Sequence, residues 1–249
     1  MSQIFHHFMS DSIVIIPTYN EIENIETIIR ATFTLHKQFD VLIVDDNSPD
    51  YTSVKVIELQ NEFPNRLFLE KRDKKSGLGT AYVHGFRWAL ARKYDFIFEM
   101  DADFSHNPTD LEKLYNACHI GAADLAIGSR YVTGVNVVNW PLSRVLMSYF
   151  ASVYVKMITG MKIHDATAGF VCYKREVLEK INLEKIKFIG YAFQIEMKYR
   201  TFAKEFQIIE VPIIFTDRTK GQSKMSNAII KEAVFGVISL RIRKLFNRL

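Results

Sequence analysis

Two aspartates lie close together after one short apolar run. Asp101 ends the strand-like run 95–101, and Asp103 follows two residues later. Carboxylates at positions i and i+2 can share one divalent cation, because hard cations take oxygen ligands. Such a cation also holds substrate phosphate oxygens, so the pair predicts a metal-bridged diphosphate. A structural alternative stays open, in which Asp101 only ends the strand and Asp103 caps the following helix.

Polar residues also follow three other short apolar runs. They are the groups Pro17 to Glu21, Asp45 to Ser48 and Gly128 to Arg130. A turn or a helix cap would explain each group by itself. In an open α/β sheet, however, ligands bind beyond the carboxyl ends of the strands. Four such groups therefore predict one binding site.

The elements that must position these residues alternate along the chain. Short apolar runs of the buried-strand type cover residues 12–19, 40–46, 66–72, 95–101 and 123–129. Helical patterns lie between them at residues 21–35, 51–62, 79–92 and 108–120. This alternation predicts an α/β fold with a mainly parallel sheet. The second half is less regular, with helical patterns at 141–160 and 226–248 and a strand-like run at 207–215.

Composition limits the class of protein. The chain has 249 residues, of which 48% are hydrophobic, so it can bury a large core and is not disordered. Cys118 and Cys172 are far apart and have no metal-binding spacing, which is typical of reduced cysteines in an intracellular protein. No uncharged apolar stretch approaches the roughly 18–20 residues that span a bilayer.

Positive charge gathers near the C-terminus. Residues 216–249 hold eight Lys and Arg against two Asp and Glu, a local charge of +6, which leaves 4 − 6 = −2 for the rest of the chain. A basic tail favours an anionic partner, either lipid or nucleic acid. No segment interleaves aromatic and basic residues as nucleic-acid platforms do, so we expect no nucleic-acid partner. The segment 228–249 combines apolar bulk with the cations Arg241, Arg243, Lys244 and Arg248, and predicts contact with a membrane surface.

Six motifs, in order, resemble the family 2 glycosyltransferases, and more narrowly the dolichol-phosphate (polyprenol-phosphate) mannose synthases. The motifs are VIIPTYNEIENI, VDDNSPD, GLGTAYVHGF, MDADFSHNP, GSRY and DRTKGQSK, which together run from about residue 12 to residue 224. The resemblance implies a GT-A fold, a GDP-mannose donor, Mg²⁺ or Mn²⁺, and a dolichyl or polyprenyl phosphate acceptor. It also implies a catalytic domain over residues 1–225, followed by a basic amphipathic helix over 226–249.

The resemblance assigns roles to individual residues. It places the nucleoside contacts on Pro17, Tyr19, Glu21, Val44 and Asp46. It matches the metal and diphosphate element to Asp101, Ala102 and Asp103, and the donor-phosphate cations to Arg130, Arg218 and Lys224. For the acceptor phosphate it indicates Arg130, Arg144 and Ser148. Some relatives carry a glutamine as a further metal ligand where this chain has Ser105, which leaves a third protein ligand in doubt.

The implied reaction needs no general base. A phosphate monoester has a second pKa near 6, so it is largely dianionic at neutral pH and attacks without losing a proton. Asp101, Asp103 and Arg130 are the expected catalytic residues, and Asp165 is expected to be structural or to support them. Attack opposite the leaving diphosphate of GDP-mannose predicts inversion and a β-mannosyl phosphate product.

Two alternatives stay open. One is a polyprenyl-phosphate transferase that uses a UDP-sugar, carrying glucose or an aminosugar. The other is a non-catalytic module that binds lipid or nucleic acid. The expected location is the cytoplasmic face of a membrane, held peripherally or through a small membrane-protein partner.

Overall fold

The structure is a computed structural model that describes residues 10–190, 192–217 and 227–246. Within these residues, a seven-stranded sheet has the order β3-β2-β1-β4-β7-β5-β8. Neighbours β1 (Ser12–Thr18), β2 (Asp40–Asp45), β3 (Leu67–Lys71) and β4 (Phe96–Glu99) are parallel. The predicted parallel sheet is confirmed for this half.

The other half of the sheet contains one reversed strand. β7 (Val171–Lys174) is antiparallel to both β4 and β5 (Leu125–Ser129), whereas β8 (Ile208–Pro212) is parallel to β5. Because β7 reverses direction between β4 and β5, the carboxyl ends of β1, β2, β4 and β5 all reach the same edge. That edge is where the four polar groups of the sequence meet.

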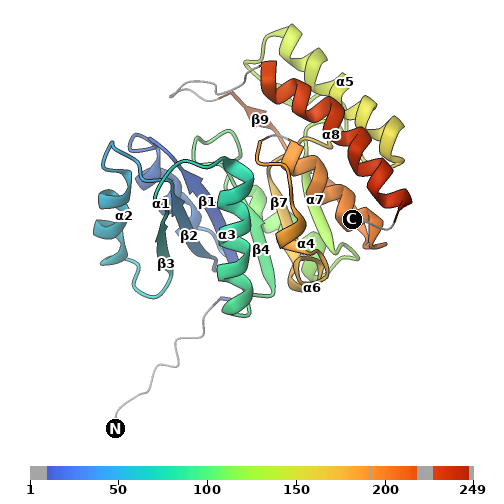
Figure 1. Ribbon diagram of the computed structural model, residues 1–249. Helices are drawn as coiled ribbons and strands as arrows, with labels where there is room; N and C mark the ends of the chain where they lie inside the picture. Colours follow the sequence, from blue (N-terminus) through green and yellow to red (C-terminus); the bar gives the residue numbers. More distant parts are fainter. Residues whose placement is uncertain (1–9, 191, 218–226, 247–249) are drawn as a thin grey trace.

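Helices cover both faces of the sheet (Figure 1). The strand side chains alternate between two apolar cores, one on each face. On one face, Val14 and Ile16 of β1 pack with α1 (Ile25–Phe33), α2 (Thr52–Gln60) and α4 (Asp110–His119). On the other, Ile13 and Ile15 pack with α3 (Leu78–Ala91), α6 (Arg175–Lys180) and α7 (Ala192–Ala203). Strands buried on both faces need apolar residues throughout, which explains the continuous runs in the sequence.

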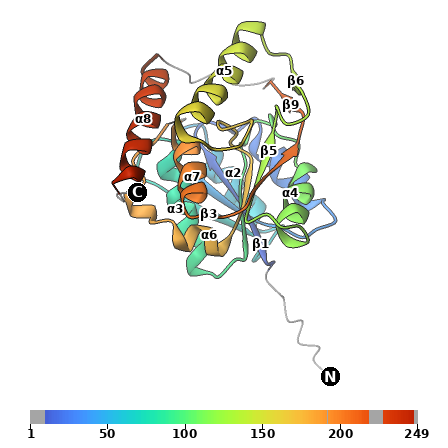
Figure 2. The ribbon, with the colours of Figure 1, turned by 90° about the vertical axis from the view of Figure 1, so that its right-hand side faces the viewer.

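Two long helices lie beside each other next to the sheet (Figures 1 and 2). They are α5 (Leu142–Thr159) and α8 (Asn227–Leu245), at the two positions predicted as long helical patterns. α8 packs against both α5 and α7, and Val237 and Leu240 reach the main core. A small parallel ladder, β6 (Val137–Val138) with β9 (Phe215–Thr216), leads the chain into α5. The predicted domain boundary at 225/226 lies outside the described residues.

The sequence did not predict β7 or α7. α7 buries Glu196, Lys198 and Arg200, so its hydropathy pattern shows no apolar stripe. Pairing explains this burial: Arg200 Nε donates to Glu196 Oε1 at 2.9 Å, and a buried charge is tolerated when it is paired. The short 3₁₀ helix at Leu183–Lys185 completes the described elements of this region.

Candidate functional site

Asp101 and Asp103 lie in the loop that follows β4 at the carboxyl edge. Asp103 Oδ1 accepts a hydrogen bond from the backbone N–H of Ser105 at 3.1 Å. Helix α4 has Thr109 as its N-cap residue, so the interpretation that Asp103 caps this helix is wrong. The Ser105 hydroxyl is buried and has no hydrogen-bond partner among the residues that the structure describes.

One cavity of about 380 Å³ opens beside this loop. Its polar end is formed by five of the predicted residues: Asp101, Asp103, Arg130, Arg144 and Ser148. Its apolar end lies between α5 and α8, where the lining residues are Met147, Ala151, Tyr154, Val155, Val234 and Val237. Tyr154 Oη donates to the carbonyl of Val234 at 2.9 Å and joins the two helices. The cavity therefore suits a ligand with a charged head and an apolar chain.

Arg130 is held firmly at the polar end. Its Nε and Nη2 donate to the two carboxylate oxygens of Asp165 at 2.7 and 2.6 Å, and Nη2 also donates to Thr167 Oγ1 at 2.8 Å. Burial by itself would raise the pKa of Asp165, but the Arg130 guanidinium outweighs it and lowers that pKa below its usual value. This fixed cation beside the two aspartates is suited to stabilising phosphate charge. Asp165 supports Arg130, as the sequence led us to expect.

Arg144 lies in the first turn of α5 and has different partners. Its Nη1 donates to Asp217 Oδ1 at 2.8 Å. Its guanidinium carbon lies 4.0 Å from the centroid of the Trp140 ring, and that of Arg130 lies 5.3 Å from the same ring. The sequence did not single out Trp140, yet this one side chain contacts the two arginines that were predicted to hold the acceptor phosphate.

The predicted nucleoside contacts lie on the neighbouring loops of the same edge. Lys75 Nζ lies 4.3 Å from the centroid of the Tyr19 ring, and Glu21 accepts a hydrogen bond from Asn24 Nδ2 at 3.1 Å. Asp46 is buried and accepts from Arg72 Nε at 2.6 Å. Arg72 was not predicted, because only the fold brings the end of β3 beside the end of β2.

Of the remaining predicted residues, two are buried and two lie outside the residues that the structure describes. Val44 is fully buried in the core, in register with Pro17 on β1, and Ala102 is buried between the two aspartates. Arg218 and Lys224 lie outside the described residues. Within the part of the chain that the structure describes, no group of three or more His, Cys, Asp and Glu residues is arranged as a metal site.

A cluster of three buried polar side chains, Glu99, Gln194 and Lys198, lies beside the cavity, and the sequence analysis did not predict it. Gln194 of α7 lines the cavity, and its Nε2 donates to Glu99 Oε2. Lys198 Nζ donates to the carbonyl of Ala168 at 2.6 Å and to Gln194 Oε1 at 3.2 Å. Burial raises the pKa of Glu99 and lowers the pKa of Lys198. These contacts fix the cavity floor at residues 167–169.

The chain is similar to sequences of one glycosyltransferase family. Residues 13–182 match the family profile described as Glycosyl transferase family 2. A polyprenol monophosphomannose synthase of Mycolicibacterium smegmatis is 47% identical over 237 residues, which is 95% of this chain and 89% of that protein. An undecaprenyl-phosphate mannosyltransferase of Micrococcus luteus is 44% identical, over 90% of this chain and 91% of that protein.

A dolichol-phosphate mannosyltransferase of Pyrococcus furiosus is 38% identical over 88% of this chain and 60% of that protein. Among solved structures, glucosyl-3-phosphoglycerate synthase from Mycobacterium tuberculosis in complex with Mn²⁺, UDP and glucosyl-3-phosphoglycerate superposes with a TM-score of 0.65. It covers 94% of this chain and 79% of its own, at 17% identity, so this likeness concerns the fold alone. The predicted GT-A fold is confirmed.

Proposed function

Because this chain belongs to glycosyl transferase family 2, we propose that it transfers mannose from GDP-mannose to a polyprenyl phosphate, with inversion. The observation that carries the proposal is the cavity, which joins two aspartates and two arginines to an apolar passage between α5 and α8. A substrate that fits both ends has a phosphate head and a hydrocarbon chain. The names of the relatives, which are polyprenyl-phosphate and dolichol-phosphate mannosyltransferases, agree with this substrate class.

The donor diphosphate is assigned to the aspartate loop. Asp101 and Asp103 line the same cavity and supply hard oxygen ligands, which fit Mg²⁺ or Mn²⁺. The orphaned Ser105 hydroxyl is a further oxygen in this loop. When bound, the cation neutralises negative charge that develops on the departing diphosphate. Arg130, and the predicted cations Arg218 and Lys224, are proposed to contact the same diphosphate.

The nucleoside is assigned to the loops after β1 and β2. Asp46 supplies a buried carboxylate that can accept hydrogen bonds from a base or a ribose, and Arg72 fixes its orientation. Tyr19 and Glu21 border the same edge, and Pro17 and Val44 shape its floor. We therefore propose that the donor lies along this edge, with its sugar directed into the cavity.

The acceptor phosphate is assigned to Arg130, Arg144 and Ser148, which line the polar end of the cavity. Two cations favour the dianionic phosphate, which attacks the anomeric carbon without a general base. The new carbon–oxygen bond forms as the bond to the GDP diphosphate breaks, so the anomeric configuration inverts. The apolar passage between α5 and α8 is proposed to receive the first part of the hydrocarbon tail.

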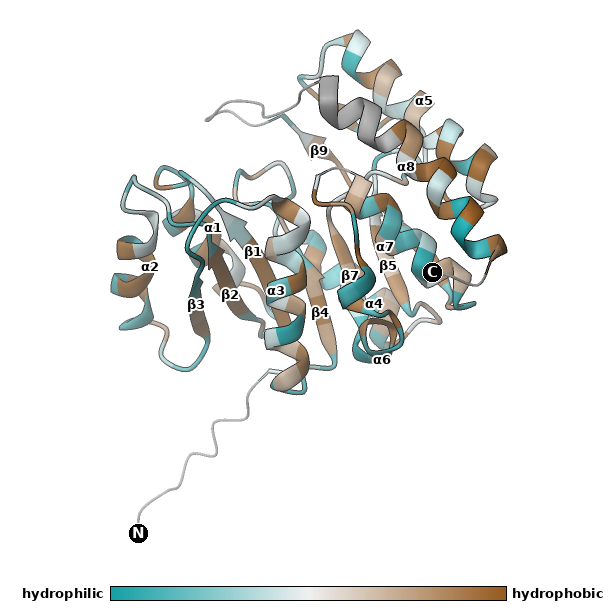
Figure 3. Ribbon diagram, viewed as in Figure 1, coloured by the Kyte–Doolittle hydropathy of each residue, from teal (hydrophilic) through white to brown (hydrophobic). Residues whose placement is uncertain are grey.

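The outer faces of α5 and α8 support a membrane-surface location. In Figure 3, α5 and the coloured part of α8 carry brown, apolar residues interspersed with teal, polar ones. The exposed apolar side chains include Leu142, Leu146, Phe150, Met157, Phe235, Ile238, Ile242 and Leu245. Lys244 is half-buried, and its Nζ lies 4.7 Å from the centroid of the Phe202 ring on α7. None of the helices within the described residues has the length and apolar content that a membrane span requires. We propose peripheral binding at the cytoplasmic face, alone or with a membrane-protein partner.

A transfer assay tests the proposal. The purified protein would receive GDP-[¹⁴C]mannose and a polyprenyl phosphate with Mg²⁺ or Mn²⁺, and label would be followed into the organic phase. Parallel reactions would use UDP-[¹⁴C]glucose, UDP-N-acetyl[¹⁴C]glucosamine and an unphosphorylated polyprenol. Label is expected with GDP-mannose and the phosphate only. Label from a UDP-sugar would overturn the donor assignment, and label on the free alcohol would overturn the acceptor assignment.

A further inference from the structure

Glu210 of β8 has an unusually complete set of hydrogen bonds for an acid on an edge strand. Its Oε1 accepts from Ser129 Oγ at 2.7 Å and from the backbone N–H of Asp165 at 2.9 Å. Its Oε2 accepts from the backbone N–H of His164 at 2.7 Å and contacts His164 Nδ1 at 2.8 Å. The carboxylate only accepts, so His164 Nδ1 carries the proton. The side chain of Glu210 is 6% exposed.

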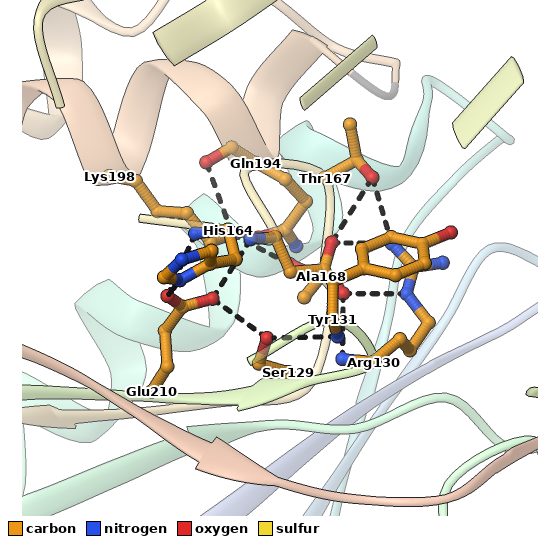
Figure 4. A network of polar contacts seen from close by, with 10 residues as sticks. Ser129, Arg130, Tyr131, His164, Thr167, Ala168, Gln194, Lys198 and Glu210 are labelled. Atoms are coloured by element: carbon orange, nitrogen blue, oxygen red, sulfur yellow. Dashed lines mark hydrogen bonds and ion pairs between the residues drawn. The ribbon is translucent and has the colours of Figure 1, made fainter. Parts of the chain in front are cut away.

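These contacts join the two segments that control Arg130, as Figure 4 shows. Ser129 directly precedes Arg130 at the end of β5, and its hydroxyl also accepts from the backbone N–H of Tyr131 at 3.3 Å. Asp165 follows His164 and receives three hydrogen bonds from Arg130, one of them from its backbone N–H at 3.0 Å. Glu210 therefore fixes both the backbone of Arg130 and the carboxylate that orients its guanidinium.

Strand pairing does not explain this arrangement. β8 is already joined to β5 by a parallel ladder that runs from Leu125 with Ile208 to Ser129 with Pro212. Glu210 lies in the middle of that ladder, opposite Ile127, where the backbone alone holds the strand. Its side chain instead reaches past the end of β5 to the 164–165 turn. A carboxylate that is desolvated and fully hydrogen-bonded at this place has a role beyond holding the sheet together.

We propose that Glu210 is a positioning residue, which holds the Arg130 guanidinium in place for substrate phosphate through Ser129 and Asp165. The inference rests on the proposed function in one respect, namely that Arg130 contacts phosphate. A cation that is already oriented binds and stabilises phosphate without reorganising, whereas a loosened one must be reordered first. Glu210→Gln replaces one of the two accepting carboxylate oxygens with an NH₂ group. This group would face the donors that now bind that oxygen, so the 164–165 turn must move.

A double-mutant cycle tests this coupling. Calorimetry would give the Kd of GDP and of farnesyl phosphate for the wild type, Glu210→Gln, Arg130→Ala and the double variant, with melting temperatures for all four. Glu210→Gln is expected to raise the Kd of at least one ligand about tenfold, as partners that orient binding groups do. In the Arg130→Ala background it is expected to change neither Kd, and the melting temperatures show that each variant is folded.

Two further variants keep the test decisive. Ser129→Ala removes one of the four contacts of Glu210 and is expected to raise the same Kd by a smaller factor, which covers the case that Glu210→Gln does not fold. Glu70→Gln is the control, because it changes a second Glu–His contact among the described residues, in which Glu70 Oε2 lies 3.0 Å from His84 Nε2. It is expected to leave both Kd values unchanged.

The outcomes separate the inference from the proposed function. Unchanged Kd values in Glu210→Gln and Ser129→Ala, or equal changes with and without Arg130, would overturn the positioning role alone. A wild type that binds phosphate ligands, shows the expected coupling and transfers no mannose would overturn the proposed function and support the positioning role. A wild type that binds neither ligand would overturn both.

Discussion

The two arginines at the polar end of the cavity are held in contrasting ways. Arg130 follows β5, its side chain is 9% exposed, and it is tied to a fully buried aspartate. Arg144 lies on α5, its side chain is 24% exposed, and its partner Asp217 is 26% exposed. The same contrast extends to the surroundings, because the sheet edge carries buried polar side chains whereas α5 and α8 carry exposed apolar side chains. A rigid edge suits the reacting diphosphate, and an accessible pair of helices suits a lipid that enters from a membrane.

The largest effect is expected at the rigid edge. Asp103→Ala removes a proposed cation ligand, so transfer is expected to fall at least about a hundredfold to a thousandfold, the range for lost charge stabilisation. EDTA should abolish wild-type transfer, and Mg²⁺ or Mn²⁺ should restore it. Circular dichroism and a melting curve would show that the variant is folded. Full activity in EDTA would remove the metal from the proposal.

The buried pair also predicts an acid-dependent stability. Asp165→Asn leaves Arg130 buried without its counter-charge, and is expected to lower the free energy of unfolding by about 3–5 kcal/mol at pH 7. Because the folded-state pKa of Asp165 is lowered, the carboxylate stabilises the fold above its unfolded pKa, near 3.9. This stabilisation is lost as pH falls through the lowered value.

Urea unfolding from pH 7 down to pH 3 would measure the difference between wild type and Asp165→Asn. The difference should narrow below about pH 4. Asp95→Asn is the matched control, since Asp95 is 60% exposed in its ion pair with Arg175, and its effect should be at most about 1 kcal/mol. A difference that stays constant with pH would show that the charge of Asp165 is not what stabilises the fold.

The apolar helices are expected to control membrane binding. Phe150 is 60% exposed on α5, and burying a side chain of this size is worth about 1.5–3 kcal/mol. Phe150→Glu should therefore weaken co-sedimentation with anionic liposomes by about tenfold to a hundredfold. Ile120→Glu is the control, since Ile120 is 79% exposed at the end of α4. Equal binding of both variants would place the membrane contact elsewhere.

The smallest effect is expected where the two arginines share an aromatic neighbour. Trp140→Leu removes the ring that lies near both guanidinium groups, and such contacts are worth about 0.5–1 kcal/mol at accessible sites. The KM for polyprenyl phosphate should rise about twofold to fivefold. Trp140→Phe keeps an aromatic face and should retain most of the wild-type affinity. Identical KM values for the Leu and Phe variants would show that the aromatic face does not position the arginines.

The same contrast explains what the sequence could predict. The position of Asp101 and Asp103 at the carboxyl edge could be predicted because it follows directly from the end of a strand. The parallel half was found because its strands are buried on both faces and alternate with helices. Arg72 was missed, since its contact with Asp46 exists only once β2 and β3 pair. Trp140 was missed because its sequence position beside Arg144 does not reveal that its ring also lies near Arg130. α7 was missed because its buried Lys198 and Glu196 have hydrogen-bond partners that a hydropathy pattern cannot reveal.

The division of roles between the sheet edge and the helices is tested most directly by titrating both substrates against Arg144→Ala. Losing one charge-assisted contact costs about 1.5–3 kcal/mol, so the KM for polyprenyl phosphate should rise about tenfold to a hundredfold. The KM for GDP-mannose should stay nearly unchanged, and Arg144→Lys should recover only part of the loss, because lysine lacks the planar fork. Arg218→Ala, at a proposed donor contact, should do the reverse. A raised KM for GDP-mannose in Arg144→Ala, with an unchanged KM for polyprenyl phosphate, would contradict the division.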